Sequence, residues 1–182
     1  HPGLEFIELD AAHDLEKLPE KYDLVFSNAC LQWLPDHRTR IRELMGLLNA
    51  GGTLAVQIPS QAKHPVHHLL TETAHGARWQ GKITSFRQYN ELTEEEYFDA
   101  LSENASAFRM WEIMYFFEMP SHESILEWYR GTGLRPYLAQ LCDEDKTAFE
   151  AEILDGIRKL YPVQKNGSII FRFPRLFFAA QN

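Results

Sequence analysis

The 182-residue sequence contains only two cysteines, Cys30 and Cys142, and no long hydrophobic run. Two thiols so far apart in the chain cannot form a disulfide framework, and such cysteine usage is typical of the cytoplasm. No apolar segment approaches the length of a membrane span, and the first residues do not resemble a signal peptide. We therefore expect a cytoplasmic protein that does not enter a membrane.

Positive charge is also scarce. The chain has 18 lysines and arginines but 26 aspartates and glutamates, which gives a formal net charge of -8. Proteins that bind a phosphate backbone usually have the opposite balance, so we expect no nucleic-acid partner. A small anionic substrate is compatible with this charge where arginines gather locally. Hydrophobic residues make up 45% of the chain, which is enough for a folded core.

The stretch Tyr22–Pro59 has the pattern strand, helix, strand. Its two apolar runs, Tyr22–Ser27 and Thr53–Ile58, show little alternation, which is typical of strands buried on both faces. A helix over His37–Leu48 is expected between them, so the pattern predicts a right-handed parallel crossover. Ligands bind at the carboxyl ends of such strands. The polar residues that follow Ser27 are therefore the first candidates for a site.

Further strands and helices are expected along the rest of the chain, without internal repeats. The expected strands are Leu4–Leu9, Met110–Met119 and Ser168–Ala179, and the expected helices cover residues 65–78, 93–104, 121–130, 136–141 and 143–160.

Four histidines, His64, His67, His68 and His75, lie around one expected helix start. Their spacing can place several rings on one helix face. A metal site also needs a converging carboxylate or thiolate, and only Glu72 lies at ligand spacing. We therefore predict no metal site and expect a solvated helix face.

Four segments carry a resemblance to a known family, and they are FSNACLQWLPDH, LLNAGGTLAVQIP, EWYRGTGLRPYL and YPVQKNGSIIFRFPRLFFAA. Together they resemble the trans-aconitate 2-methyltransferase family of class I S-adenosylmethionine (SAM) methyltransferases, over nearly the whole chain. The resemblance implies an α/β fold with a Rossmann-like sheet in the strand order 3-2-1-4-5-7-6, and a helical cap. We expect the cap helices at about 80–106 and 121–160.

The resemblance assigns the expected strands to the third to seventh positions of that sheet. The first two strands and the glycine-rich loop that holds SAM have no counterpart, so we expect residues 1–182 to form a single domain that is incomplete at its N-terminal end. Tyr22–Ser27 would then have an unpaired apolar edge, which proteins avoid. We expect this edge to be covered by Leu4–Leu9 moved inward, by a partner chain in a homodimer, or by another segment.

The cofactor-binding residues that the resemblance implies are Asp10, Ala11, Ser27, Asn28, Ala29 and Trp33. Asp10 would accept a hydrogen bond from the adenine amino group, and the Asn28 carbonyl would face the methionine ammonium. The alternative for Asp10 is a solvated aspartate, and that for Asn28 is an Asx turn that only shapes the loop. The alternative for Trp33 is an ordinary core position.

The substrate-binding candidates are Gln32, Trp128, Tyr129, Arg130, Arg135, Tyr161 and Arg175. An arginine guanidinium can donate two hydrogen bonds to one carboxylate, so the arginines are the strongest candidates for binding a polycarboxylate. Among them we rank Arg130 first, because it belongs to one of the segments that carry the resemblance. Lys82 and Arg87 are weaker candidates. The alternative for each arginine is a surface charge or an ion pair with an acidic residue.

These residues and the resemblance predict a SAM-dependent O-methyltransferase that forms a methyl ester on a small polycarboxylate such as trans-aconitate. The carboxylate nucleophile is already deprotonated, so the protein has to align the reactants, and no catalytic acid or base is expected. The alternatives are a SAM methyltransferase with another small acceptor and a non-catalytic fragment unable to bind SAM. Because the glycine-rich loop has no counterpart, we expect this chain alone to be inactive.

Overall fold

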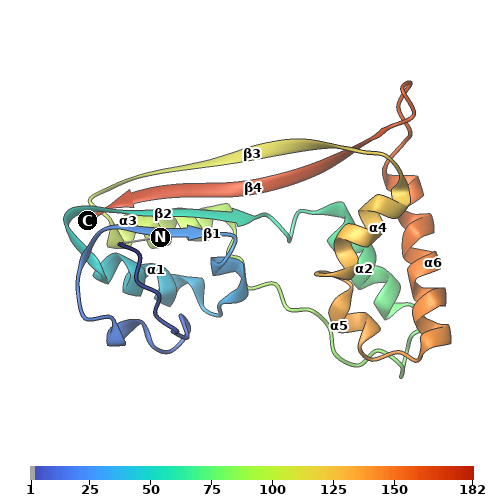
Figure 1. Ribbon diagram of the computed structural model, residues 1–182, viewed down its shortest axis with the longest axis horizontal. Helices are drawn as coiled ribbons and strands as arrows, with labels where there is room; N and C mark the ends of the chain where they lie inside the picture. Colours follow the sequence, from blue (N-terminus) through green and yellow to red (C-terminus); the bar gives the residue numbers. More distant parts are fainter. Residues whose placement is uncertain (1–2) are drawn as a thin grey trace. The chain divides into compact units, whose positions relative to one another are not determined.

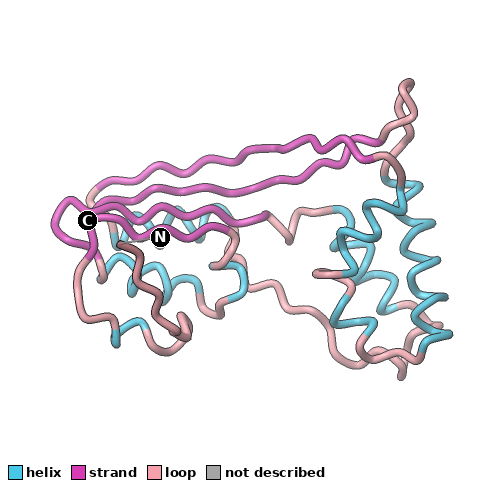
Figure 2. Tube along the Cα trace, in the orientation of Figure 1, coloured by secondary structure: helices cyan, strands magenta, loops and turns pink. Residues whose placement is uncertain are grey.

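The computed structural model describes residues 3–182, which divide into two compact units. Unit 1 comprises residues 3–59, 90–112 and 176–182, and unit 2 comprises residues 60–89 and 113–175. Two long strands, β3 (Ala107–Met119) and β4 (Ile169–Gln181), contribute residues to both units. They are among the magenta traces in Figure 2.

The sheet has four strands in the order β1-β2-β4-β3, where β1 is Tyr22–Asn28 and β2 is Leu48–Pro59. β1 and β2 run parallel, with Leu24 opposite Thr53. Helix α1 (His37–Gly46) connects them, so the predicted crossover is confirmed. In the expected sheet, β1, β2, β3 and β4 take the fourth, fifth, sixth and seventh positions. The observed order therefore matches the 4-5-7-6 end of the predicted strand order. Gly52 allows the close approach of the two strands, because a Cβ there would lie 2.9 Å from the Tyr22 carbonyl oxygen.

The core of unit 1 lies on one face of this sheet. Helices α1 and α3 (Glu94–Asn104) cover that face together, as Figure 1 shows. Ile41 of α1 and Leu101 of α3 pack there with Leu54 of β2. Helix α3 confirms the helix expected over residues 93–104, and it belongs to unit 1, whereas the helices within residues 121–160 lie in unit 2. A capping box between Thr93 and Glu96 fixes the start of α3.

The opposite face of the sheet in unit 1 is open among the described residues. On β1, Val25 packs against the core, whereas its neighbours Leu24 and Phe26 are 58% and 67% exposed. The expectation that this strand is buried on both faces is therefore wrong. An apolar run shows that a strand is hydrophobic, but the elements on either side decide how much of it is covered.

The segment Leu4–Leu9 forms no strand, which corrects the sequence-based assignment. Leu4, Phe6 and Ile7 are exposed, and β1 is the edge strand of the sheet, so this segment does not cover the β1 edge. A strand needs a neighbour for its backbone N–H and C=O groups, and no described strand beyond β1 provides one. Two short 3-10 helices, Leu15–Lys17 and Leu31–Trp33, flank β1 in sequence.

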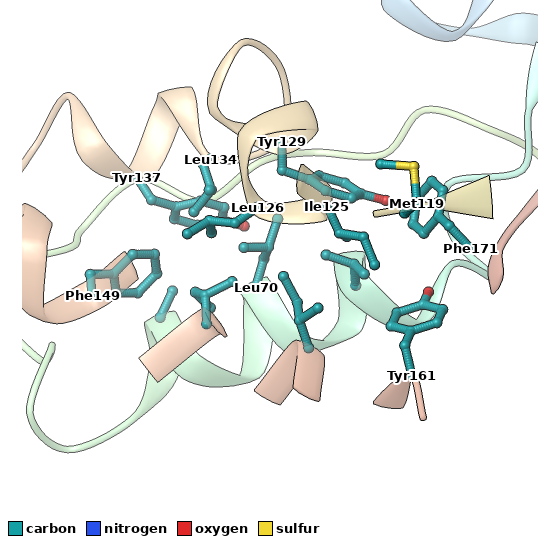
Figure 3. Close-up of a cluster of buried hydrophobic side chains, with 14 of the residues drawn as sticks. Leu70, Met119, Ile125, Leu126, Tyr129, Leu134, Tyr137, Phe149, Tyr161 and Phe171 are labelled. Carbon is teal, nitrogen blue, oxygen red and sulfur yellow. The ribbon is translucent and has the colours of Figure 1, made fainter. Parts of the chain in front are cut away.

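Unit 2 contains four helices, which are α2 (Pro65–His75), α4 (His122–Arg130), α5 (Arg135–Leu138) and α6 (Asp143–Leu160). Their buried side chains form one hydrophobic cluster with the adjoining part of β4. Figure 3 shows the ring of Phe149 beside that of Tyr137 in this cluster. Within residues 3–182, no helix is both long enough and apolar enough to cross a bilayer.

Candidate active site

The carboxyl end of β1 is where sequence reasoning placed the cofactor residues of unit 1. Asn28 ends the strand opposite Gln57 of β2, and the Ala29 amide donates to the Gln57 carbonyl at 2.9 Å. Ala29 adopts a left-handed backbone conformation with φ of 51°. This conformation is uncommon for a residue with a side chain, and such outliers cluster at ligand sites.

Gln32 lies one turn beyond this strand end and is only 7% exposed. Its Nε2 donates to the Ala29 carbonyl at 2.8 Å, which holds the turn together. Its Oε1 is buried without a hydrogen-bond partner among the described residues. A buried acceptor without a donor costs free energy, so Gln32 is a local source of instability at this strand end.

The other residues predicted at this strand end surround the same turn. Ser27 is half-buried, and Asn28 is exposed. Trp33 closes the 3-10 helix and is also exposed, which does not fit its alternative as an ordinary core residue. The side chains at the end of β1 are therefore accessible to a ligand, although their individual contacts stay predictions.

Asp10 organises its own loop in unit 1. Its carboxylate accepts a hydrogen bond from the Ala12 amide at 2.9 Å and contacts His13 Nδ1 at 2.9 Å. The hydrogen bond with His13, followed by that from Ala12, lowers the pKa of this exposed carboxyl. Ala11, next in sequence, packs against the core of the unit. Asp10 thus stays ionised and available as an acceptor, and its contact with adenine stays a prediction.

The predicted aromatic substrate residues occupy different environments in unit 2. Tyr129 is buried, and its hydroxyl lies 3.0 Å from His64 Nδ1. Tyr161 is also buried, and its hydroxyl has no partner among the described residues. Trp128 is partly exposed and packs near the rings of Phe171 and Phe173.

The predicted arginines differ in how their charge is matched. Arg130 binds Glu150 through two nitrogens, at 2.8 and 2.9 Å, and also pairs with Glu127, which raises the pKa of the guanidinium. Its charge is thus balanced within unit 2. Arg135 is exposed at the start of α5, and the Arg175 guanidinium lies 4.9 Å from the ring centre of Phe173. The charge of Lys82, a weaker candidate, is matched by Asp145 at 2.7 Å.

Two histidines that were expected on a solvated helix face are buried, which is a correction. His64 and His67 are 1% and 7% exposed, because the first turn of α2 packs into unit 2. Burial lowers the pKa of His64 to about 4 and that of His67 to about 3. Sequence reasoning missed this polar group. The only sign of it in the sequence was the close spacing of the four histidines. Within the described residues, no three metal-ligating side chains converge.

Comparisons with known proteins agree with the fold of the chain. Residues 1–56 match the family described as Methyltransferase domain. The chain is also similar in fold to the crystal structure of a candidate methyltransferase from Bacillus halodurans, with a TM-score of 0.55 and 12% identity over 100% of this chain and 72% of that one. The YcgJ protein from Bacillus subtilis gives a TM-score of 0.51 and 14% identity over 92% and 68%.

Three relatives named trans-aconitate 2-methyltransferase are much closer in sequence. Identity is 40% to the Agrobacterium fabrum protein (90% of this chain, 65% of the relative), 38% to that of Rhizobium etli (98% and 70%) and 37% to that of Escherichia coli O157:H7 (99% and 69%). The chain therefore spans about two thirds of the length of these relatives. It belongs to the trans-aconitate 2-methyltransferase family, a family of class I SAM-dependent methyltransferases.

Proposed function

We propose that the protein containing this chain transfers a methyl group from SAM to a carboxylate oxygen of a small polycarboxylate such as trans-aconitate. The observation that carries this proposal is the 38% identity to the Rhizobium etli trans-aconitate 2-methyltransferase over 98% of the chain. A carboxylate oxygen forms a bond to the methyl carbon as the bond from that carbon to sulfur breaks. The products are a methyl ester and S-adenosylhomocysteine, and the negative and positive charges of the reactants cancel.

The end of β1 in unit 1 fits a donor of this kind. The methionine part of SAM carries an ammonium, and the buried Oε1 of Gln32 and the carbonyl of Asn28 are acceptors at the strand end. In this proposal Asn28 binds and orients the donor, Gln32 lines the position of the reacting methyl group on the substrate side, and Trp33 shields this position from water. No side chain has to move a proton, since a carboxylate is ionised at neutral pH.

A mass-spectrometric assay on the complete gene product tests the proposal. Incubation with SAM and trans-aconitate should give a product heavier by one methyl group, together with S-adenosylhomocysteine. Calorimetric titration with S-adenosylhomocysteine separates the alternatives. Tight binding without ester formation would contradict the polycarboxylate and favour another acceptor, whereas absence of binding would support a non-catalytic protein.

Replacing Gln32 tests its assignment to the site. Gln32→Leu removes the unpaired Oε1 but also the bond to Ala29, so stability should change by no more than about 1 kcal/mol. The affinity for at least one of the two ligands, S-adenosylhomocysteine and trans-aconitate, should fall about tenfold, because a hydrogen bond to that ligand is lost. Thermal melting and calorimetric titration measure the two effects. A variant that binds both ligands like the wild type would remove Gln32 from the site.

The proposal also includes the partners and the location of the protein. A small-molecule substrate is the partner that the family implies. A homodimer through the β1 edge is supported by the position of β1 at the end of the described sheet, where no described strand pairs with its outer side. A cytoplasmic location is supported by the free, exposed thiols of Cys30 and Cys142, which are typical of a reducing compartment.

A further inference from the structure

Residues 29–36 of unit 1, here named the β1 turn, begin and end on a backbone outlier. Ala29 and Asp36 have left-handed conformations with φ of 51° and 50°, and they are the non-glycine residues with positive φ within residues 3–182. Such a conformation costs free energy for a residue with a side chain, and it persists only where neighbouring contacts enforce it. Contacts from other elements must therefore hold the β1 turn in place.

A buried pair of polar side chains lies behind this turn. His37, the first residue of α1, is completely buried, and its Nδ1 shares a hydrogen bond of 2.5 Å with the Tyr97 hydroxyl of α3. Burial raises the pKa of Tyr97, so the hydroxyl keeps its proton at neutral pH. Burial also lowers the pKa of His37, so the ring is neutral there. The pair is thus an uncharged hydrogen-bonded link between two helices.

The ring of His37 also interacts with the backbone of the β1 turn. The carbonyl groups of Leu31 and Leu34 favour its protonated form, although the effect of burial on the pKa is larger. In sequence, these carbonyls lie immediately before Gln32 and immediately after Trp33. The imidazole therefore connects α3 to the piece of backbone that presents Gln32 and Trp33.

A polar pair at this position is not the most stable way to fill the core. Burying an imidazole and a hydroxyl costs free energy unless each finds a partner, whereas apolar side chains of similar volume need none. A hydrogen bond does add a fixed distance and direction, which apolar packing lacks. On its outer side the turn is accessible, since Trp33 is exposed and the neighbouring Asn28 is exposed as well. The turn is thus anchored from within and open to a ligand from outside.

We infer that His37 and Tyr97 are positioning residues for the ligand site at the end of β1. They touch neither the methyl donor nor the acceptor. Through the hydrogen bond between them they fix the β1 turn, so that Gln32 and Trp33 keep the places that the proposed function gives them. This inference rests on the proposed function and deepens it, because alignment of the reactants then depends on two residues outside the site.

The test compares Tyr97→Phe with the control Tyr22→Phe in the complete gene product. Tyr97→Phe removes the hydroxyl that His37 contacts and keeps the ring in the core. We expect kcat for methylation of trans-aconitate to fall about tenfold, with KM changing less than about threefold, because a displaced turn impairs alignment more than binding. Tyr22→Phe makes the same change at the other end of β1 and should leave both constants unchanged. Rates are expressed per site that binds S-adenosylhomocysteine, so that unfolded protein does not count.

Amide hydrogen exchange gives a second readout that needs no turnover. The amides of Trp33 and Leu34 donate to the carbonyls of Cys30 and Leu31 within the β1 turn. In Tyr97→Phe these two amides should exchange about five- to tenfold faster, because a hydrogen bond that holds the turn is lost. Amides of α6, which belongs to unit 2, should keep their rates. In the wild type, S-adenosylhomocysteine should slow the exchange of the two turn amides.

The outcomes separate this inference from the proposed function. Faster exchange with unchanged kcat in Tyr97→Phe would overturn the inference alone, because the pair would then only stabilise the fold, and unchanged exchange would overturn it too. A wild type that binds S-adenosylhomocysteine but forms no ester contradicts the proposed acceptor. The inference is then supported if Tyr97→Phe weakens the protection of the turn amides by that ligand, and overturned if it does not. A wild type that binds no S-adenosylhomocysteine overturns both. Should Tyr97→Phe not fold, His37→Gln undergoes the same measurements with the same expected results.

Discussion

Acidification from pH 7 to pH 5 is expected to destabilise unit 2 strongly. An exposed histidine has a pKa of 6.5, whereas burial lowers that of His64 to about 4 and that of His67 to about 3. The unfolded state therefore binds protons first as the pH falls. Stability that is fully present above pH 6.5 is lost towards pH 4, by about 2 kcal/mol for each histidine at pH 5.

Urea unfolding at the two pH values measures this loss. His67→Gln should reduce the difference between pH 7 and pH 5 by about 2 kcal/mol, since one buried titrating group is gone. His68→Gln is the matched control, because His68 is the next residue on α2 and is exposed. It should change the difference less than His67→Gln does, because it leaves both buried rings in place. An equal loss of stability in the wild type and in His67→Gln would contradict the assignment of neutral, buried rings.

Gly133→Ala is expected to destabilise unit 2 by about 1–3 kcal/mol, because it adds a methyl group to a filled core. The new Cβ would lie 2.7 Å from Tyr129 Cδ1, 3.1 Å from Leu70 Cδ1 and 3.3 Å from His67 Cε1. Tyr129 and Leu70 are both buried, so neither can move away without disturbing its neighbours.

Gly131→Ala provides the control for this substitution. Gly131 lies two residues earlier, has a φ of -73° and has no atom within 4 Å of its missing Cβ. The change to alanine should therefore stabilise the protein by about 0.4–1 kcal/mol, by restricting the unfolded chain. Thermal melting of both variants decides between steric conflict and a general requirement for glycine. Equal melting temperatures would rule out the conflict at Gly133.

Local chemistry explains which elements could be predicted from sequence. Helix α6 begins and ends where expected, because acidic residues fill its first turn, Arg158 and Lys159 lie in its last turn, and Phe149, Ile153 and Ile157 form its buried stripe. Helix α3 follows a capping box in the same way. These signals act within a few residues, so a sequence contains them in full.

Features that depend on distant neighbours could not be predicted in this way. The burial of His64 depends on Arg172 and Tyr129, which are far from it in sequence. The balance of charge on Arg130 of α4 depends on Glu150 of α6, two helices further along the chain. The position of the candidate site at the end of β1 followed from strand topology, whereas the partners of each side chain followed only from packing.

The open face of the sheet in unit 1 also links folding to association. Leu24, Phe26, Trp111 and Phe177 alternate with core-facing residues, and the rings of Trp111 and Phe177 stack on each other there. A surface that covered this face would bind the folded unit and not the unfolded chain. By mass action, each tenfold rise in the concentration of that covering surface above its Kd adds about 1.4 kcal/mol to the free energy of unfolding. If a second chain covers this face, the stability of unit 1 depends on the concentration of that chain as well as on its own sequence.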